Sequence, residues 1–195
     1  MVITDETLIQ ESAEGSRAAF ELLVQRWDGR MLRYFMRCTP SHQEAEDMRQ
    51  ELFLRLYLRA GTFKPDGVFQ SWIYRIATNL VIDKIGRKKS MQAGLHETID
   101  EQEEGPVLSV QEQSREQVKQ GELQFYLEKA LAALPAEQRV TLVMRHFEGF
   151  QFDEMADLLG EPESTLKSRV YRGLMALRQE LKRMGIMELD CFQEV

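Results

Sequence analysis

The chain has 195 residues, of which 43% are hydrophobic and 29% are charged. These fractions are close to the averages of globular proteins and exclude wholesale disorder, collagen-like repeats and low-complexity fibres. The length suffices for one large domain or for two small ones, each with a core of its own, and we expect two. The formal net charge is −7, but the charge is unevenly distributed along the chain.

Neither a membrane segment nor a secretory signal is expected. No apolar run approaches the roughly 20 residues that span a bilayer, and residues 1–6 lack the basic and then apolar pattern of a signal peptide. The cysteines, Cys38 and Cys191, are far apart and lack C-x-x-C spacing, so free thiols are expected rather than a disulfide or a zinc site. These features predict a cytoplasmic protein that does not insert into membranes.

An acidic segment separates two nearly neutral blocks. It is poor in apolar residues and contains the helix-breaking pair Gly105-Pro106. The net charge is +2 for residues 1–90, −6 for 91–124, 0 for 125–184 and −3 for 185–195. We therefore predict a first domain at 1–90, a flexible linker at 91–124, a second domain at 125–184 and a tail at 185–195.

The first block is predicted to be helical, because apolar residues recur at spacings of three and four and period-two alternation is absent. Ser16 can cap a helix that ends at Thr39-Pro40. Ser41 and Glu44 form a capping box for a second helix, which Gly61 ends. A third helix follows at about 69–85, and it is expected to close at Gly86, before a basic run.

The second block is also predicted to be helical, so the fold class is all-α, with two small helical domains. A helix runs to Leu134, and Pro135 is suited to open the next one. A short helix at about 152–159, a turn at 160–162 and a long final helix then follow. A short helix, a glycine turn and a long helix are the pattern of a helix-turn-helix.

The final helix carries the strongest local charge, because residues 163–183 hold six basic and two acidic side chains. A run of charge alone is typical of a solvated helix face. The polar residues at the amino end of this helix favour contact with DNA instead, because they are of the types that read base edges. These residues are Ser164, Thr165, Lys167, Ser168 and Tyr171.

Two further faces are ambiguous from the sequence. The helix at 69–85 places aromatic residues beside Arg75 and Asn79, which suits stacking of unpaired bases, but by spacing alone the aromatics are expected to pack in the core. On the second helix, Asp47 and Glu51 share an exposed face that is either a docking surface or simply solvated.

An enzyme is not expected. His42, His96 and His146 are scattered, and the sequence contains neither an H-E-x-x-H motif nor a P-loop nor a nucleophile elbow. We therefore predict no catalytic residues, no metal and no cofactor.

Residues 5–183 resemble the extracytoplasmic-function (ECF) sigma factors of bacterial RNA polymerase. Short motifs in both domains carry the resemblance in the order and spacing of that family. Residues 45–53 (AEDMRQELF) are similar to its polymerase-docking helix, and residues 69–79 (FQSWIYRIATN) to its promoter-melting segment. The second domain opens as in the family with residues 134–139 (LPAEQR), and residues 164–172 (STLKSRVYR) look like its recognition helix.

The resemblance implies a sigma factor that binds core RNA polymerase, directs initiation at particular promoters and helps to open the DNA. It implies polymerase contacts at Asp47, Gln50, Glu51 and Phe53. It implies contacts with single-stranded bases of the downstream, minus-ten element at Phe63, Phe69, Trp72, Arg75, Asn79, Arg87 and Lys88. It implies contacts with the double-stranded upstream, minus-thirty-five element at Ser164, Thr165, Lys167, Ser168 and Tyr171, and at Arg169 and Arg172 on phosphates.

An anti-sigma factor is a further partner that the resemblance allows. The alternative interpretation is a self-sufficient helix-turn-helix regulator whose first domain senses a ligand or a partner. Such a regulator would need a pocket in its first domain, whereas the resemblance implies a docking face and a face for single-stranded DNA there.

Overall fold

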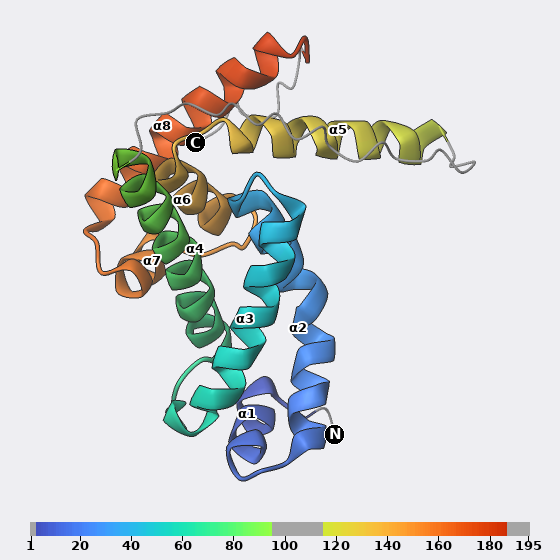
Figure 1. The fold of residues 1–195 in the computed structure, drawn as a ribbon, viewed down its shortest axis with the longest axis vertical. Helices are drawn as coiled ribbons and strands as arrows, with labels where there is room; N and C mark the ends of the chain where they lie inside the picture. The colour runs from blue at the N-terminus through green and yellow to red at the C-terminus, as the bar shows by residue number, and fades with distance from the viewer. Residues whose placement is uncertain (1–2, 95–114, 187–195) are drawn as a thin grey trace.

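The computed structural model describes the backbone of residues 3–94 and 115–186 and the side chains of residues 3–84 and 123–186. Within these ranges the chain is helical and contains no strand, which confirms the all-α prediction (Figure 1). No helix in the described ranges has the length and the apolar character needed to cross a membrane. The elements are α1 (Asp5–Ala13), α2 (Arg17–Cys38), α3 (His42–Arg59), the 3-10 turn η1 (Ala60–Thr62), α4 (Phe69–Gly94), α5 (Arg115–Ala132), α6 (Ala136–His146), α7 (Phe152–Leu159) and α8 (Glu163–Arg183).

Serine caps fix the starts of the two helices that form the body of the first domain. The hydroxyl of Ser16 accepts a hydrogen bond from the backbone N–H of Ala19, and the hydroxyl of Ser41 accepts one from the backbone N–H of Glu44. Both caps were predicted, because serine satisfies a backbone donor that the first helical turn leaves unpaired. The Glu44 carboxylate lies 3.8 Å from the ammonium of Lys84, so it links α3 to α4.

Helix α1 is absent from the expectations above, although Thr4 caps it and two acidic residues occupy its first turn. Asp5 accepts hydrogen bonds from the indole N–H of Trp27, at 2.9 Å, and from Arg26, at 2.7 Å. Glu6 accepts one from the backbone N–H of Phe69, at 3.0 Å. Helix α1 therefore holds the start of α4 against α2.

Helix α4 does not close at Gly86, as predicted, but continues to Gly94. An internal glycine costs only about 1 kcal/mol relative to alanine, and the flanking lysine and arginine residues are good helix formers. Helix α5 begins at Arg115, ten residues before the predicted start of the second domain. Both ends of the segment 91–124 are therefore helical, and residues 95–114 lie outside the described part of the chain.

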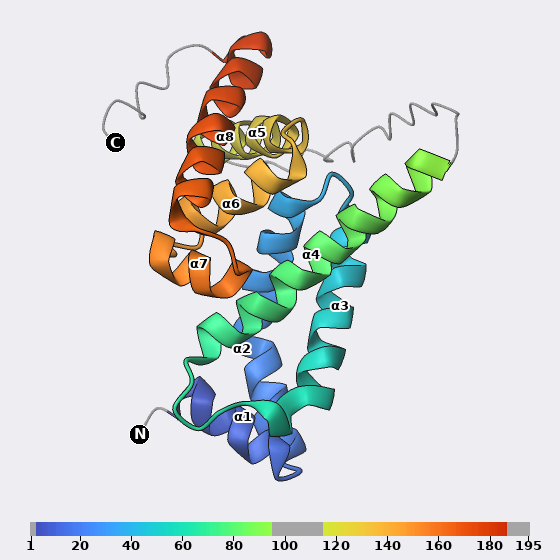
Figure 2. The same ribbon diagram turned by 90° about the vertical axis from the view of Figure 1, so that its left-hand side faces the viewer.

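The two helical domains pack against each other (Figure 2). Helix α6 lies beside α2, and α7 lies beside α4. The buried apolar side chains of both domains form one continuous cluster. The expectation of two separate cores is therefore wrong, because residues on α2 and α4 face the second domain as well as their own.

The opposite faces of α3 should differ sharply in their effect on stability. Leu52 is fully buried and Leu58 is 71% exposed, so Leu52→Ala should lower the free energy of unfolding by about 2–5 kcal/mol. Leu58→Ala should change it by no more than about 0.5 kcal/mol. Chemical denaturation of the two variants measures both values, and equal losses would show that the face of α3 has been misassigned.

Candidate functional site

The solvent face of α3 carries the residues predicted to bind polymerase. Asp47 and Gln50 are exposed, and Glu51 is half-buried. The side chain of Glu51 accepts a hydrogen bond from Arg55 at 2.7 Å, which holds its carboxylate along the helix. Phe53 differs from these three, because it packs against the core and offers only part of its ring to a partner.

Apolar residues extend this face toward the end of α3. Leu54 is 54% exposed and Leu58 is 71% exposed, and they follow Asp47 and Glu51 at helical spacing. Tyr57, beside them, is also exposed and packs edge-on against Phe20, with ring centroids 5.1 Å apart. Leu54 and Leu58 were not predicted to be part of this face, although large apolar side chains opposite the buried stripe of α3 were the signal.

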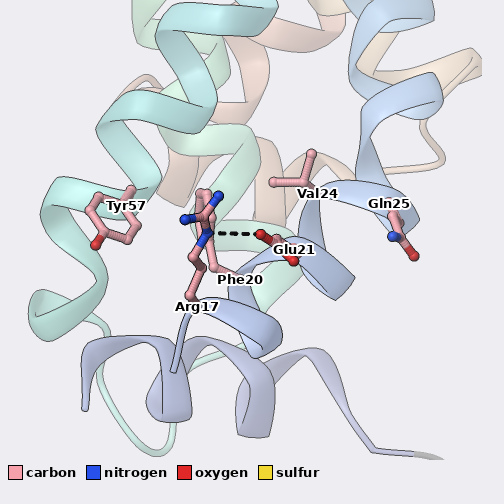
Figure 3. Close-up of a pocket in the computed structure, with 6 residues that line it drawn as sticks. All are labelled: Arg17, Phe20, Glu21, Val24, Gln25 and Tyr57. Carbon is pink, nitrogen blue, oxygen red and sulfur yellow. Dashed lines mark hydrogen bonds and ion pairs between the residues drawn. The ribbon is translucent and has the colours of Figure 1, made fainter. Parts of the chain in front are cut away.

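A shallow groove between α2 and α3 adjoins this apolar surface (Figure 3). Its walls carry Phe20, Val24 and Tyr57, and an ion pair between Arg17 and Glu21, at 2.9 Å, lies along it. The remaining lining residue is Gln25. The surface of α3 is therefore acidic at its amino end and apolar at its carboxyl end.

A second surface lies on α4, where Arg75 and Asn79 are exposed one turn apart. Trp72 is half-buried. Phe69 is 1% exposed and Phe63 is also buried, in an aromatic cluster in which the rings of Phe63 and Trp72 lie 5.3 Å apart. Packing covers both rings in this conformation, and the DNA contacts of Phe63 and Phe69 stay a prediction. Arg87 and Lys88 lie outside the residues whose side chains are described.

The buried phenylalanines position the loop that leads into α4. Phe63 and Phe69 anchor the two ends of this loop, and Lys64 and Val68 are exposed between them. Gly67 approaches the loop backbone closely, since a Cβ there would lie 3.0 Å from the carbonyl oxygen of Lys64. The loop is therefore a compact ridge next to the exposed face of α4.

A third surface is built by α7, a tight turn and α8. The turn requires Gly160, whose φ of 68° lies in the left-handed region that side chains disfavour. The Glu154 carboxylate accepts a hydrogen bond from the backbone N–H of Gln151 at 2.7 Å, which fixes the start of α7. Short helix, glycine turn and long helix thus form the helix-turn-helix that the sequence predicts.

The exposed stripe of α8 contains most of the predicted upstream-element residues. Ser164, Lys167, Ser168, Tyr171 and Arg172 are exposed, whereas Thr165 and Arg169 are half-buried. Tyr171, which is 67% exposed, places an aromatic side chain on this stripe. Met175, 47% exposed and one turn further on, extends the stripe and was not predicted.

The cations of α8 differ in how they are held. Arg169 lies 2.7 Å from Glu161 and 3.5 Å from Glu137, and its side chain is 21% exposed. Arg172 instead bonds only within α8, to the hydroxyl of Ser168 at 2.8 Å. Arg169 therefore supports the turn in this conformation, and Arg172 is the better placed of the two to reach a phosphate.

Cys38 and Tyr34, two groups with shifted pKa values, lie in the interior rather than in these surfaces. Burial raises the pKa of the Cys38 thiol to about 12 and also raises the pKa of the Tyr34 hydroxyl. Cys38 is a free cysteine, as predicted, whereas Cys191 lies outside the described residues. No group of three or more His, Cys, Asp or Glu side chains in the described chain is arranged to hold a metal ion.

Comparison with known proteins identifies the family of the chain. Residues 23–91 match the family model of sigma-70 region 2, and residues 124–177 match that of sigma-70 region 4. The chain thus belongs to the sigma-70 family. Within it, the chain is an ECF sigma factor.

Curated relatives match nearly the whole chain. The RNA polymerase sigma-H factor of Pseudomonas aeruginosa is 28% identical over 91% of this chain and 94% of its own length. The ECF sigma factor SigW of Bacillus subtilis is 29% identical over 89% of this chain and 95% of its own length. The ECF sigma factor SigE of Mycolicibacterium smegmatis is 31% identical over 88% of this chain and 66% of its own length.

Two solved structures share the fold. CnrH in complex with the cytosolic domain of CnrY has a TM-score of 0.61 and 19% identity, over 92% of this chain and 97% of that one. RpoE in complex with the anti-sigma factor NepR from Bartonella quintana has a TM-score of 0.61 and 22% identity, over 84% of this chain and 96% of that one.

Proposed function

We propose that this protein binds core RNA polymerase through α3, opens promoter DNA with α4 and recognises the upstream element with α8. The observation that carries the proposal is that each of these helices buries one face and exposes another with the matching chemistry. The net charge of −7 supports dependence on polymerase, because autonomous DNA binding relies on positive charge. The protein would act in the cytoplasm, without membrane insertion, metal or cofactor.

Transcription from promoter DNA by purified core polymerase, with and without this protein, tests the proposal. Initiation at defined sites only when the protein is present is expected. An anti-sigma factor is a further proposed partner, because the RpoE structure of the same fold is a complex with one. The proposed domains are those of the sequence analysis, with the second one starting earlier, at α5.

Reversing one charge on α3 should weaken polymerase binding without affecting the fold. Asp47 is exposed, so Asp47→Arg should change the free energy of unfolding by no more than about 0.5 kcal/mol. At an interface, the reversed charge should lower the affinity for core polymerase by at least about tenfold. Fluorescence anisotropy measures the affinity, and Glu14→Arg, at an exposed position just after α1, is the control. Equal affinity of the two variants would exclude α3 as the docking helix.

Removal of one amide from α4 should impair DNA opening. Asn79 is exposed, and an amide can pair with the edge of an unpaired base. Asn79→Ala should reduce open-complex formation by about fivefold, because one hydrogen bond contributes about 1 kcal/mol of free energy. Polymerase binding should stay intact. Permanganate footprinting on a duplex promoter measures opening. Asp83→Ala, one turn further along the exposed face, is the control, and identical footprints for both variants would contradict the role of Asn79.

Base reading and phosphate contact on α8 should be separable. Lys167→Ala should cost about 1–3 kcal/mol on the preferred upstream element and relax base preference there. Arg172→Ala should weaken binding to all sequences alike. It should also reduce by about 0.9 the slope of the logarithm of the binding constant against the logarithm of the salt concentration, as expected for one lost phosphate contact. Both are measured with holoenzyme over a series of salt concentrations and promoter variants. An unchanged ranking of promoter variants with Lys167→Ala would mean that Lys167 reads no base.

A further inference from the structure

The second domain covers one side of α4. The ring of Tyr74 packs edge-on against Phe150, with centroids 4.9 Å apart, and the hydroxyl of Thr78 lies 3.9 Å from the sulfur of Met144. Arg75 donates a hydrogen bond to the backbone carbonyl of Asp157 in α7, at 3.3 Å. The helix proposed to open DNA is therefore in direct contact with α6, α7 and the segment between them.

Glu148, just after α6, is the polar centre of this contact. Its side chain is only 4% exposed. Arg30 Nε lies 3.3 Å from one carboxylate oxygen, Arg37 Nη1 lies 3.6 Å from the other, and the hydroxyl of Tyr74 donates a hydrogen bond to the first. These three partners all belong to the first domain. Arg30 and Arg37 are seven residues apart, so they lie on one face of α2.

Aromatic rings hold the two arginines in place. The guanidinium of Arg37 lies 4.5 Å from the ring centroid of Phe147, and that of Arg30 lies 5.4 Å from that of Tyr74. A buried carboxylate is unfavourable unless donors satisfy its oxygens. Because the first domain supplies the donors, burial of Glu148 is compensated only when the two domains are in contact in this way.

This closed arrangement cannot span a promoter. Helix α7 packs against both α4 and α8, so α4 and α8 approach to within about 20 Å, two interhelical distances. The minus-ten and minus-thirty-five elements lie about 25 base pairs apart, or about 85 Å along B-form DNA at 3.4 Å per pair. The proposed function therefore requires the domains to separate.

We propose that Glu148 holds the free protein in a closed resting state, which must open before α4 and α8 engage their two promoter elements. The requirement for opening rests on the proposed function, whereas the closed state rests on the contacts alone. The apparent affinity for polymerase equals the affinity of the open state multiplied by the fraction of molecules that are open, so closure lowers it. Loss of the carboxylate shifts the protein toward the open state.

Cys38 offers a probe of opening. Its thiol is 1% exposed, its pKa is raised to about 12 by burial, and Arg139 and Glu148 of the second domain lie close enough to influence it. In a Cys191→Ser background, Glu148→Ala should increase the rate at which a thiol reagent labels Cys38 by at least about tenfold, since the closed state then leaves the partly buried Arg30 and Arg37 without their carboxylate partner. Small-angle X-ray scattering of the same full-length variant should show a larger radius of gyration.

Two further variants separate opening from unfolding. Asp153→Ala removes an exposed carboxylate from α7 and should behave as the parent protein. A combined variant removes the charges on both sides of the contact: Arg30→Met, Arg37→Met, Tyr74→Phe and Glu148→Met. It should restore compactness and slow labelling, because well-packed apolar side chains can replace a buried ion pair without loss of stability. Circular dichroism should show native helix content in each variant.

Unchanged scattering and labelling in Glu148→Ala would overturn the closed state. A Glu148→Ala protein that opens but binds core polymerase no more tightly than the parent would overturn its role in restraining function. If the parent protein fails to bind core polymerase at all, the proposed function fails, and scattering and labelling still decide whether Glu148 holds the domains together.

Discussion

The arrangement of this molecule depends on one buried carboxylate that is satisfied across a domain boundary. Glu148 belongs to the second domain, yet its partners Arg30, Arg37 and Tyr74 come from α2 and α4. Such a group stabilises one relative position of the domains and penalises others, since a displaced partner leaves a charge buried and unpaired. The apolar contact between Tyr74 and Phe150 further stabilises the same relative position of the domains.

The same helices serve both the core and the proposed functional surfaces, because each presents different faces to different neighbours. Helix α3 buries Leu52 and exposes an acidic and apolar stripe, and α8 buries Leu166 and exposes a polar stripe with Tyr171. Helix α4 is the exception, since its exposed face is narrow and one of its sides is covered by the second domain. In the proposed function, this division lets an acidic protein contact DNA in two places while polymerase supplies much of the affinity.

Local rules made most of the fold predictable, whereas contacts distant in sequence were not. Serine caps, proline stops and apolar spacing located seven of the described helices, and Gly160 marked the turn of the helix-turn-helix. The continuation of α4 past Gly86 was missed because the cost of one glycine is small. The burial of Phe69 and the pairing of Arg169 with Glu161 depend on tertiary packing. The role of Glu148 was invisible because its partners lie 74 to 118 residues away.

In the proposed mechanism, the two domains are joined in the free protein and separate on polymerase. Pulsed electron paramagnetic resonance can measure the distance between spin labels placed at Glu14 in the first domain and Gln179 on α8, both exposed, in a Cys191→Ser background. We predict one short, narrow distance distribution for the free protein and a distribution longer by tens of ångströms after core polymerase and promoter DNA are added. A broad distribution in the free protein would contradict the closed state. The same short distance in the complex would contradict the separation of the domains.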